Sequence, residues 1–191
     1  MKVVAFNGSP RKEGNTFQSL KVVCDELERA GIDTEIVQVG GKPIRGCTSC
    51  YACFKNKNRE CVITEDELND YVKKMIEVDG IIIGSPVYFS NVSSETKAFI
   101  DRAGLVARAN DYLFARKAGA AVVAVRRAGA TFAFSAINFF FFIQQMMVPG
   151  SVYWNLGIGR DPGEVQKDEE GIVTFKTLGR NMAWLLKKMK A

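Results

Sequence analysis

Residues 3–16 constrain the fold more than any other stretch of the chain. An apolar run at 3–6 has the character of a strand, a turn at Gly8-Ser9-Pro10 ends it, and a helical pattern starts at Asn15. The first backbone N–H groups of a helix have no intrahelical partner and carry partial positive charge, so this arrangement favours a bound anion. Four side chains there can add hydrogen-bond donors, namely Ser9, Arg11, Asn15 and Thr16. We therefore expect a strand–loop–helix unit that holds a phosphate group.

Two commoner phosphate motifs do not fit this spacing. In a Walker loop four residues separate the glycines and a lysine follows the second one, whereas here five residues separate Gly8 from Gly14 and Asn15 stands in the lysine position. The dinucleotide fingerprint G-x-G-x-x-G is absent as well, because Ser9 and Pro10 follow Gly8. The loop suits a terminal monophosphate better than a pyrophosphate or a triphosphate. An ordinary turn without a ligand is the alternative interpretation.

Length and composition narrow the function classes. The 191 residues are most simply one domain with a substantial core, and a hydrophobic share of 47% is ordinary for a globular protein. The net charge of +5 is spread along the chain, apart from Lys187, Lys188 and Lys190, so the sequence does not indicate a nucleic-acid groove. The absence of histidine excludes Ser-His-Asp and Cys-His nucleophile systems and HExxH metal sites. The chemistry must then come from a cofactor, carboxylates, lysines, tyrosines or thiols.

Short apolar stretches alternate with helical patterns along the chain. We expect strands at residues 2–7, 34–39, 80–84, 118–125 and 152–156. We expect helices at 15–30, at 94–107 and from about 131 to 147. A further helix is expected to follow a capping box at 64–67 and to extend to the end of an apolar stripe at Ile76, and the last helix covers the stripe 175–189. Residues 160–174 stay unassigned. This alternation predicts an α/β fold with a doubly wound, five-stranded parallel sheet and helices on both faces. Residues 1–191 would form one domain with a cysteine-rich insertion at about 40–63.

Three loops are expected at the carboxyl ends of the strands, where such sheets bind their ligands: 8–16, 85–92 and 126–131. The second loop contains Pro86-Val87-Tyr88-Phe89, which is apolar and aromatic and suits the wall of a flat ring system. The third loop starts with Arg126-Arg127-Ala128-Gly129 and could stabilise negative charge on the ring, although a solvated strand end would look the same. A planar ring, a short spacer and a terminal monophosphate describe flavin mononucleotide (FMN).

The cysteine pattern is the sharpest local motif. Cys47, Cys50 and Cys53 form an overlapping C-x-x-C-x-x-C run, and Cys61 follows after seven residues. Such a run is more typical of a [4Fe–4S] cluster than of zinc, whose sites usually pair two separated hooks. Zinc, a thiol–disulfide switch and incidental thiols are the other interpretations. Basic residues nearby, Lys55, Lys57 and Arg59, are expected to lower the pKa of these thiols. Cys24 lies on a helical apolar stripe, so we expect it in the core.

The segment 128–159 contains no charged residue, but its dense apolar part, Phe132 to Ile143, is shorter than the roughly 20 residues of a membrane span. We expect a buried helix that also forms a subunit interface, and no membrane span. The first strand follows Met1-Lys2 directly, so no signal peptide is expected. Five cysteines without an export signal suggest ligand or redox roles in a reducing, cytoplasmic environment.

The sequence resembles the NADPH-dependent FMN reductases and iron–sulfur flavoproteins of the flavodoxin-like superfamily. The resemblance covers roughly residues 1–150 and rests on Gly8-Ser9-Pro10-Arg11 with Gly14-Asn15-Thr16, on Ser85-Pro86-Val87-Tyr88, and on the cysteine run. It implies the strand order 2-1-3-4-5 and a homodimer or homotetramer with FMN near the interface. It also implies that Ser9, Arg11, Asn15 and Thr16 hold the phosphate, with Phe17 among the cofactor-binding residues, and that Pro86, Val87, Tyr88 and Phe89 hold the isoalloxazine. The loop Arg126, Arg127, Ala128 and Gly129 is placed by analogy only, because it departs from the family's Gly-rich form.

The resemblance implies an oxidoreductase that passes electrons from NAD(P)H through FMN to a small-molecule or protein acceptor. The alternatives are an iron–sulfur flavoprotein or flavodoxin-like electron carrier without its own substrate, and a redox-sensing or metal-binding module centred on 47–61. Carriers usually present an acidic face to basic partners, so the net charge of +5 favours the enzyme.

Overall fold

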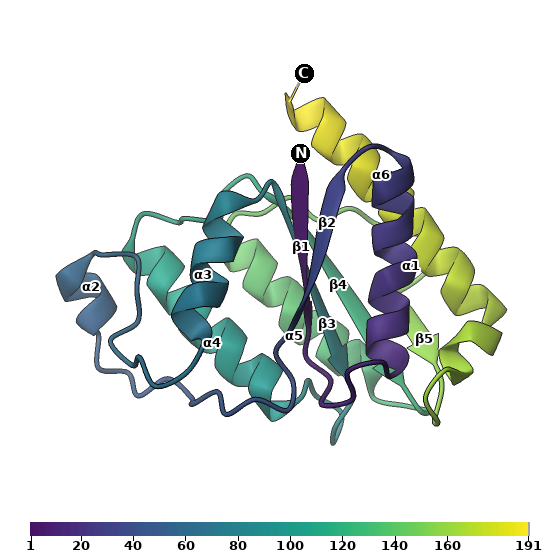
Figure 1. Ribbon diagram of the computed structural model, residues 1–191, viewed down its shortest axis with the longest axis horizontal. Helices are drawn as coiled ribbons and strands as arrows, with labels where there is room; N and C mark the ends of the chain where they lie inside the picture. The colour runs from purple at the N-terminus through teal and green to yellow at the C-terminus, as the bar shows by residue number, and fades with distance from the viewer. Residues whose placement is uncertain (191) are drawn as a thin grey trace.

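A computed structural model describes residues 1–190 and has a five-stranded, wholly parallel sheet at its centre (Figure 1). The strand order is β2-β1-β3-β4-β5, which confirms the predicted topology. The strands are β1 (Lys2–Asn7), β2 (Asp33–Gln38), β3 (Gly80–Pro86), β4 (Ala118–Val125) and β5 (Leu156–Ile158).

Helices cover both faces of the sheet. They are α1 (Asn15–Arg29), α2 (Ala52–Asn56), α3 (Leu68–Glu77), α4 (Ser94–Ala109), α5 (Ala130–Ile143) and α6 (Glu169–Lys190), with a 3₁₀ helix η1 (Glu164–Lys167) before α6. Figure 1 shows α1 and α6 on one side of the sheet and α3, α4 and α5 on the other, with α2 at the far end of the second layer. Two cores follow, one on each face.

The central strands explain why this architecture forms. Every residue of β4 is buried, as expected for a strand of a parallel sheet that is covered on both faces. In β3, Ile81 and Ile83 join the core beneath α3, α4 and α5, whereas Ile82 packs with α1 and α6. Because neighbouring side chains of a strand point to opposite faces, an unbroken apolar run supplies both cores at once.

Three expectations about the elements need correction. Helix α3 begins at Leu68 and has no side-chain cap, so the capping box at 64–67 is wrong: Asp66 accepts a hydrogen bond from the Leu68 N–H but also pairs with a buried arginine. Strand β5 overlaps the predicted 152–156 only at Leu156, because residues 152–154 lie exposed in a loop. Helix α5 ends at Ile143, and Gln145 has a φ of 59°.

Two segments for which no helix or strand was predicted contain short helical elements. The unassigned residues 160–174 contain η1 and the first turns of α6, and the cysteine-rich insertion contains α2. Among residues 1–190, no helix combines the length and apolar character that crossing a membrane requires.

Candidate functional site

The loop after β1 is packed tightly against its neighbours at the carboxyl edge of the sheet. The Gly8 N–H donates to the Gly84 carbonyl oxygen at 2.8 Å, and Ser93 Oγ donates to the Gly8 carbonyl oxygen at 2.7 Å. A Cβ atom at position 8 would lie only 1.9 Å from Thr96 Oγ1. The sequence therefore needs glycine here, because the start of the loop sits directly on β3 and α4.

Two polar side chains at the ends of adjacent strands shape the same loop. Asn7 Oδ1 accepts from the Ser9 N–H at 3.1 Å, and Asn7 Nδ2 donates to Gln38 Oε1 at 2.8 Å. Gln38 Nε2 donates in turn to the carbonyl oxygens of Ser9 and Gly40, both at 2.6 Å. Sequence reasoning missed both residues. A signal was available, since Asn7 and Gln38 are polar residues that end the adjacent strands β1 and β2.

The loop and the first turn of α1 present a row of unused donors. Within residues 1–190, the backbone N–H groups of Lys12, Glu13, Asn15, Thr16 and Phe17 have no hydrogen-bond partner. The side chains of Ser9 and Thr16 are buried beside them, and Ser9 Oγ accepts from the Arg11 N–H at 3.2 Å. Backbone donors at a helix start, with a hydroxyl on either side, are the donor set that a phosphate requires. The residues present therefore fit the phosphate of FMN.

Asn15 and Arg11 contact a segment that sequence reasoning left unassigned. Asn15 Nδ2 donates to the Asp161 carbonyl oxygen at 3.0 Å, and Asn15 Oδ1 accepts from the N–H groups of Gly163 at 2.9 Å and Val165 at 3.3 Å. Arg11 Nη1 donates to the Arg160 carbonyl oxygen at 3.4 Å. Residues 160–165 thus form one wall beside the phosphate loop, and the role of the Asn15 and Arg11 side chains as phosphate donors stays a prediction.

The second and third predicted loops touch each other. Tyr88 and Asn91 exchange backbone hydrogen bonds of 2.9 and 3.0 Å around a tight turn, in which Phe89 and Ser90 have φ values of 48° and 60°. A Cβ atom at Gly129, whose φ is +85°, would lie 2.6 Å from Ser90 Oγ. The structure therefore brings loop 85–92 and the start of α5 together at the same edge of the sheet, as the fold predicted.

The side chains of these two loops face solvent. Phe89 is fully exposed and Tyr88 about half-exposed, while Pro86 and Val87 are partly buried. Arg126, Arg127 and Ala128 are exposed. Arg127 and Gly129 line a hollow of about 230 Å³ together with Trp154 and Asp168. An aromatic turn and a basic loop therefore lie at one edge of the sheet, and their role in holding a ring system stays a prediction.

The four clustered cysteines line one small hollow of about 20 Å³. Cys47 and Cys50 are exposed, Cys53 is buried and Cys61 is half-buried, and none forms a disulfide. Within residues 1–190, no three His, Cys, Asp or Glu side chains converge in a way that could hold a single metal ion. Four thiols around one volume are the donor set of a [4Fe–4S] cluster, so the residue types fit that group.

The thiols do not share the lowered pKa that the nearby basic residues predicted. The Ala52 N–H, and after it the Thr48 hydroxyl, lower the pKa of Cys50. Burial raises the pKa of Cys53. The nearby basic residues Lys55, Lys57 and Arg59 are exposed and contribute to neither pKa shift. The expectation that they lower the thiol pKa is therefore wrong for Cys53. For Cys50 the direction is as expected, but its cause is different.

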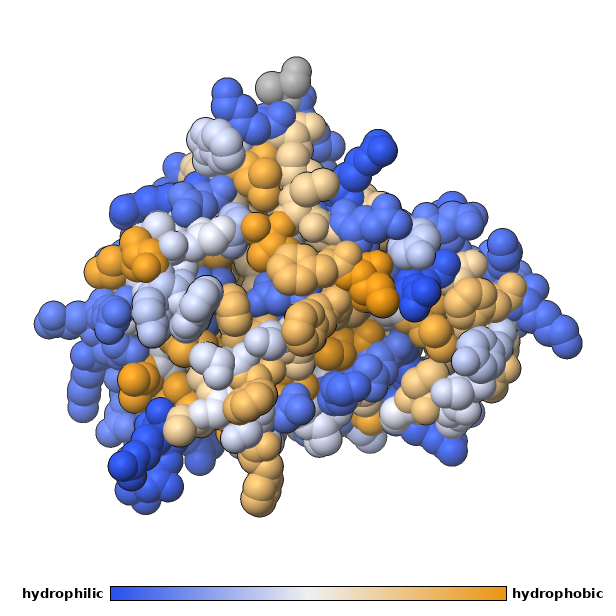
Figure 2. Space-filling model, turned by 180° about the vertical axis from the view of Figure 1, so that it is seen from behind, coloured by the Kyte–Doolittle hydropathy of each residue, from blue (hydrophilic) through white to orange (hydrophobic). Residues whose placement is uncertain are grey.

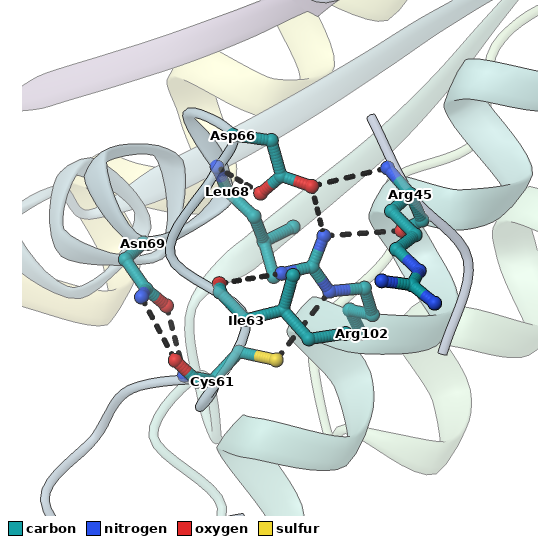
Figure 3. A network of polar contacts seen from close by, with 7 residues as sticks. All are labelled: Arg45, Cys61, Ile63, Asp66, Leu68, Asn69 and Arg102. Carbon is teal, nitrogen blue, oxygen red and sulfur yellow. Dashed lines mark hydrogen bonds and ion pairs between the residues drawn. The ribbon is translucent and has the colours of Figure 1, made fainter. Parts of the chain in front are cut away.

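A buried arginine on α4 reaches into the cysteine segment (Figure 3). Arg102 Nε donates to Cys61 Sγ at 3.4 Å, and its guanidinium also pairs with Asp66 and with two backbone carbonyl groups. Sequence reasoning missed this residue. The signal was its helical position, three residues after Phe99 and four before Val106 on the buried face of α4, where an arginine needs compensating partners.

Apolar side chains gather on the face shown in Figure 2. We name the following set the α5 surface: Phe139, Phe142, Val152, Tyr153 and Trp154, each more than half exposed. These residues line a hollow of about 510 Å³, and Phe139 also borders a second one near Ile143. The predicted buried helix is therefore only partly buried, because one side of α5 packs on β4 while the other is open.

Comparisons with known proteins agree with this architecture. The sequence model that describes the NADPH-dependent FMN reductase family matches residues 1–161 of this chain. An iron–sulfur flavoprotein of Methanocaldococcus jannaschii is 36% identical over 196 residues, with 100% of each chain covered. An iron–sulfur flavoprotein of Archaeoglobus fulgidus is 32% identical, covering 95% of this chain and 94% of its own.

A likeness to a solved structure extends the agreement to the fold. The structure of RosB with bound 8-demethyl-8-formylriboflavin-5'-phosphate has a TM-score of 0.77 at 19% identity and covers 100% of this chain and 80% of its own. An archaeal flavodoxin has a TM-score of 0.62 at 17% identity, with 100% of each chain covered. The match over residues 1–161 and the full-length relatives lead to one conclusion: this chain belongs to the NADPH-dependent FMN reductase family, together with the iron–sulfur flavoproteins.

Proposed function

We propose that the chain binds FMN across the carboxyl edge of its sheet and acts as an oxidoreductase that takes electrons from NAD(P)H. The observation that carries the proposal is the set of unpartnered backbone N–H groups at 12, 13 and 15–17, together with the buried hydroxyls of Ser9 and Thr16. These groups would hold the phosphate at the start of α1, where the helix dipole also favours negative charge. The turn at 86–89 and the loop 126–129 would border the ring.

When bound, FMN supplies the redox chemistry, and the residues of this chain bind it, orient it and limit the access of water. Tyr88 and Phe89 offer aromatic faces beside the ring. A chain without histidine can perform this reaction, because hydride transfer to a flavin needs no imidazole base from the protein. The acceptor is a small molecule or a protein, and the family name supports a nicotinamide nucleotide as the donor.

Comparing FMN with riboflavin tests the phosphate site. Because riboflavin lacks the phosphate, we expect it to bind at least about tenfold more weakly than FMN, since each 1.4 kcal/mol of lost interaction is a factor of ten. Quenching of flavin fluorescence on titration measures both affinities. Equal affinities would contradict the phosphate cradle. Bleaching of bound FMN by NADPH without oxygen would then support the enzyme, and inertness to both NADPH and NADH would support a carrier.

The two arginines after β4 are proposed to favour the negatively charged reduced flavin or to contact a nicotinamide phosphate. Both are exposed, and Arg127 borders the hollow beside Trp154. We expect Arg126→Ala and Arg127→Ala to lower the flavin reduction potential or raise the KM for NADPH by several-fold, with FMN still bound. The exposed Arg180, in the opposite layer and paired with Glu26, provides the control Arg180→Ala. Wild-type potential and wild-type KM in both loop variants would show that the loop is only a solvated strand end.

A second candidate function is supported by the cysteines. Four thiols border one hollow, and full-length relatives are named iron–sulfur flavoproteins. In this alternative Cys47, Cys50, Cys53 and Cys61 hold a [4Fe–4S] cluster, and the chain passes electrons between flavin and cluster. Purification without oxygen, followed by iron and sulfide assays, distinguishes it. About four irons and four sulfides per chain support the cluster, and fewer than about two irons contradict it.

The α5 surface supports a homodimer or homotetramer. Large exposed apolar patches on a monomer usually mark interaction sites, and segment 128–159 has no charge to oppose close approach of a second copy. Asn138 Oδ1, which belongs to a residue lining the larger hollow, is buried and has no partner within residues 1–190. A donor from a second subunit would satisfy that oxygen, as buried polar atoms generally require.

A further inference from the structure

We propose that Arg102 is a positioning residue for the Cys61 thiol: its guanidinium holds that sulfur at the hollow shared by the four cysteines and stabilises negative charge on it. The inference rests on the proposed cluster, because a metal-bound thiolate would carry the negative charge that the guanidinium stabilises. Figure 3 shows the guanidinium between Cys61, Asp66 and two backbone carbonyl groups. Arg102 itself borders the hollow, together with the cysteines.

The surroundings of Arg102 leave it almost no freedom to move. Its side chain is 0% exposed, and that of Asp66 is 4% exposed. Nη1 pairs with Asp66 and donates to the Arg45 carbonyl oxygen at 3.0 Å, while Nη2 donates to the Ile63 carbonyl oxygen at 2.9 Å. Burying a guanidinium is costly unless its donors are used, and here each nitrogen has a partner. The third nitrogen, Nε, donates to Cys61 Sγ at 3.4 Å.

The backbone of Cys61 is held by a different residue. The Cys61 N–H donates to Asn69 Oδ1 at 2.8 Å, and Asn69 Nδ2 donates to the Cys61 carbonyl oxygen at 2.9 Å. Asn69 therefore fixes the main chain, whereas Arg102 fixes the sulfur. Variants of Asn69 and of Arg102 can therefore distinguish the effect of fixing the Cys61 backbone from the effect of the hydrogen bond to its sulfur.

The contact has a chemical consequence for a bound cluster. Reduction adds one negative charge to a cluster, and N–H···S hydrogen bonds favour the more negative state, so they raise the reduction potential. Arg102 belongs to α4, a long helix of the core, whereas Cys47 and Cys50 precede the short helix α2 and Cys53 lies within it. Arg102 would thus connect Cys61, the cysteine separated in sequence from the other three, to a helix of the core.

The test compares four forms of the full chain, purified without oxygen: wild type, Arg102→Lys, Asn69→Ala and the double variant Arg102→Gln/Asp66→Asn. Iron, sulfide and FMN per chain are measured, together with the potential of the cluster and the Tm. Lysine keeps the charge opposite Asp66 but loses the forked geometry, so Arg102→Lys should lower cluster retention by about 10- to 100-fold and lower the potential of the remaining cluster. Asn69→Ala should reduce retention but leave the potential unchanged. FMN content should stay at the wild-type level in all forms.

Two results would overturn the proposal. In the first, Arg102→Lys and the double variant lose thermal stability but keep the cluster content and potential of the wild type, which means that Arg102 is only a structural residue. In the second, Asn69→Ala shifts the potential as much as Arg102→Lys does, which means that the hydrogen bond to the sulfur has no separate effect.

A further measurement separates failure of this inference from failure of the proposed cluster. If the wild type contains no iron or sulfide, the cluster and the effect on its potential are both overturned. Hydrogen exchange in the cluster-free protein then tests the positioning itself. Segment 59–66 should exchange about tenfold faster in the double variant than in the wild type, as loss of about 1.4 kcal/mol of local stabilisation would give. Equal exchange would overturn the positioning role as well.

Discussion

At the scale of single residues, the path of the loop after β1 is set by residues other than the proposed phosphate donors. Gly8 permits the chain to lie against Gly84 and Thr96, while Asn7 and Gln38 fix the path of the next two residues. The donors themselves are mostly backbone N–H groups, so their positions are set by these neighbours. Changes in the supporting residues should therefore reduce flavin affinity even though they remove no phosphate contact.

Gly8→Ala tests this dependence. The added Cβ would meet Thr96 Oγ1 at 1.9 Å and the Gly84 carbonyl oxygen at 2.8 Å, so the loop must shift away from β3. We expect the free energy of unfolding to fall by about 1–3 kcal/mol, as overpacking typically costs, and FMN affinity to fall at least about tenfold. Denaturant unfolding and fluorescence titration measure the two quantities.

Gly46→Ala is the matched control, because no atom lies within 4 Å of a Cβ placed there. It should change stability by no more than about 0.5 kcal/mol, in line with other surface substitutions. If Gly8→Ala behaved like Gly46→Ala in both measurements, the close packing of this loop would not matter for flavin binding.

At the scale of elements, α5 has two different sides. Ala133, Ile137 and Phe141 are fully buried against the sheet, whereas Phe139 and Phe142 are open to solvent. A solvated helix of a globular protein usually carries charged residues on its outer side, and α5 carries none. The helix thus has the composition of an element that is covered on both sides, which is the reason to assign it to a subunit interface.

Phe139→Glu, made together with Phe142→Glu, should shift the protein towards the monomer, because a carboxylate at the centre of an apolar interface is left desolvated and unpaired. Light scattering coupled to size-exclusion chromatography measures the molar mass. Trp184→Glu is the control: Trp184 is 63% exposed, close to the 67% of Phe139, but it lies on α6 in the opposite layer. An unchanged molar mass in the double variant, or an equal loss in the control, would contradict the assignment of the interface to α5.

The elements also show what the sequence could predict. The apolar runs of β1, β3 and β4 could be predicted because each strand is buried on both faces, and the helix α1 could be predicted because its apolar stripe is regular. Strand β5 was misplaced because it has three residues and follows an exposed apolar segment that has the same hydrophobic pattern as a strand. Burial of a segment depends on which other elements pack against it, and the residues of the segment alone do not show this.

At the scale of the whole molecule, the parallel topology brings the site together. Three loops that are far apart in sequence, 8–16, 85–92 and 126–131, each follow a strand of the parallel sheet. Because the strands all point the same way, the sequence predicts that these loops lie at one edge of the sheet, and the structure places them there. The wall formed by 160–165 was not expected, because its contact with Asn15 spans about 150 residues and involves backbone groups of a turn. The partners of Arg102 were missed for a similar reason, since three of its four contacts are backbone carbonyl oxygens or a sulfur atom.

The central claim concerns the whole carboxyl edge of the sheet: FMN lies there with its phosphate at the start of α1. A crystal structure of the protein grown with FMN tests it most directly. The account predicts that the phosphate oxygens lie within about 2.7–3.2 Å of the backbone nitrogens of residues 12–17, with the ring between loops 85–92 and 126–131. FMN bound elsewhere, or this edge closed by side chains in the presence of saturating FMN, would contradict it.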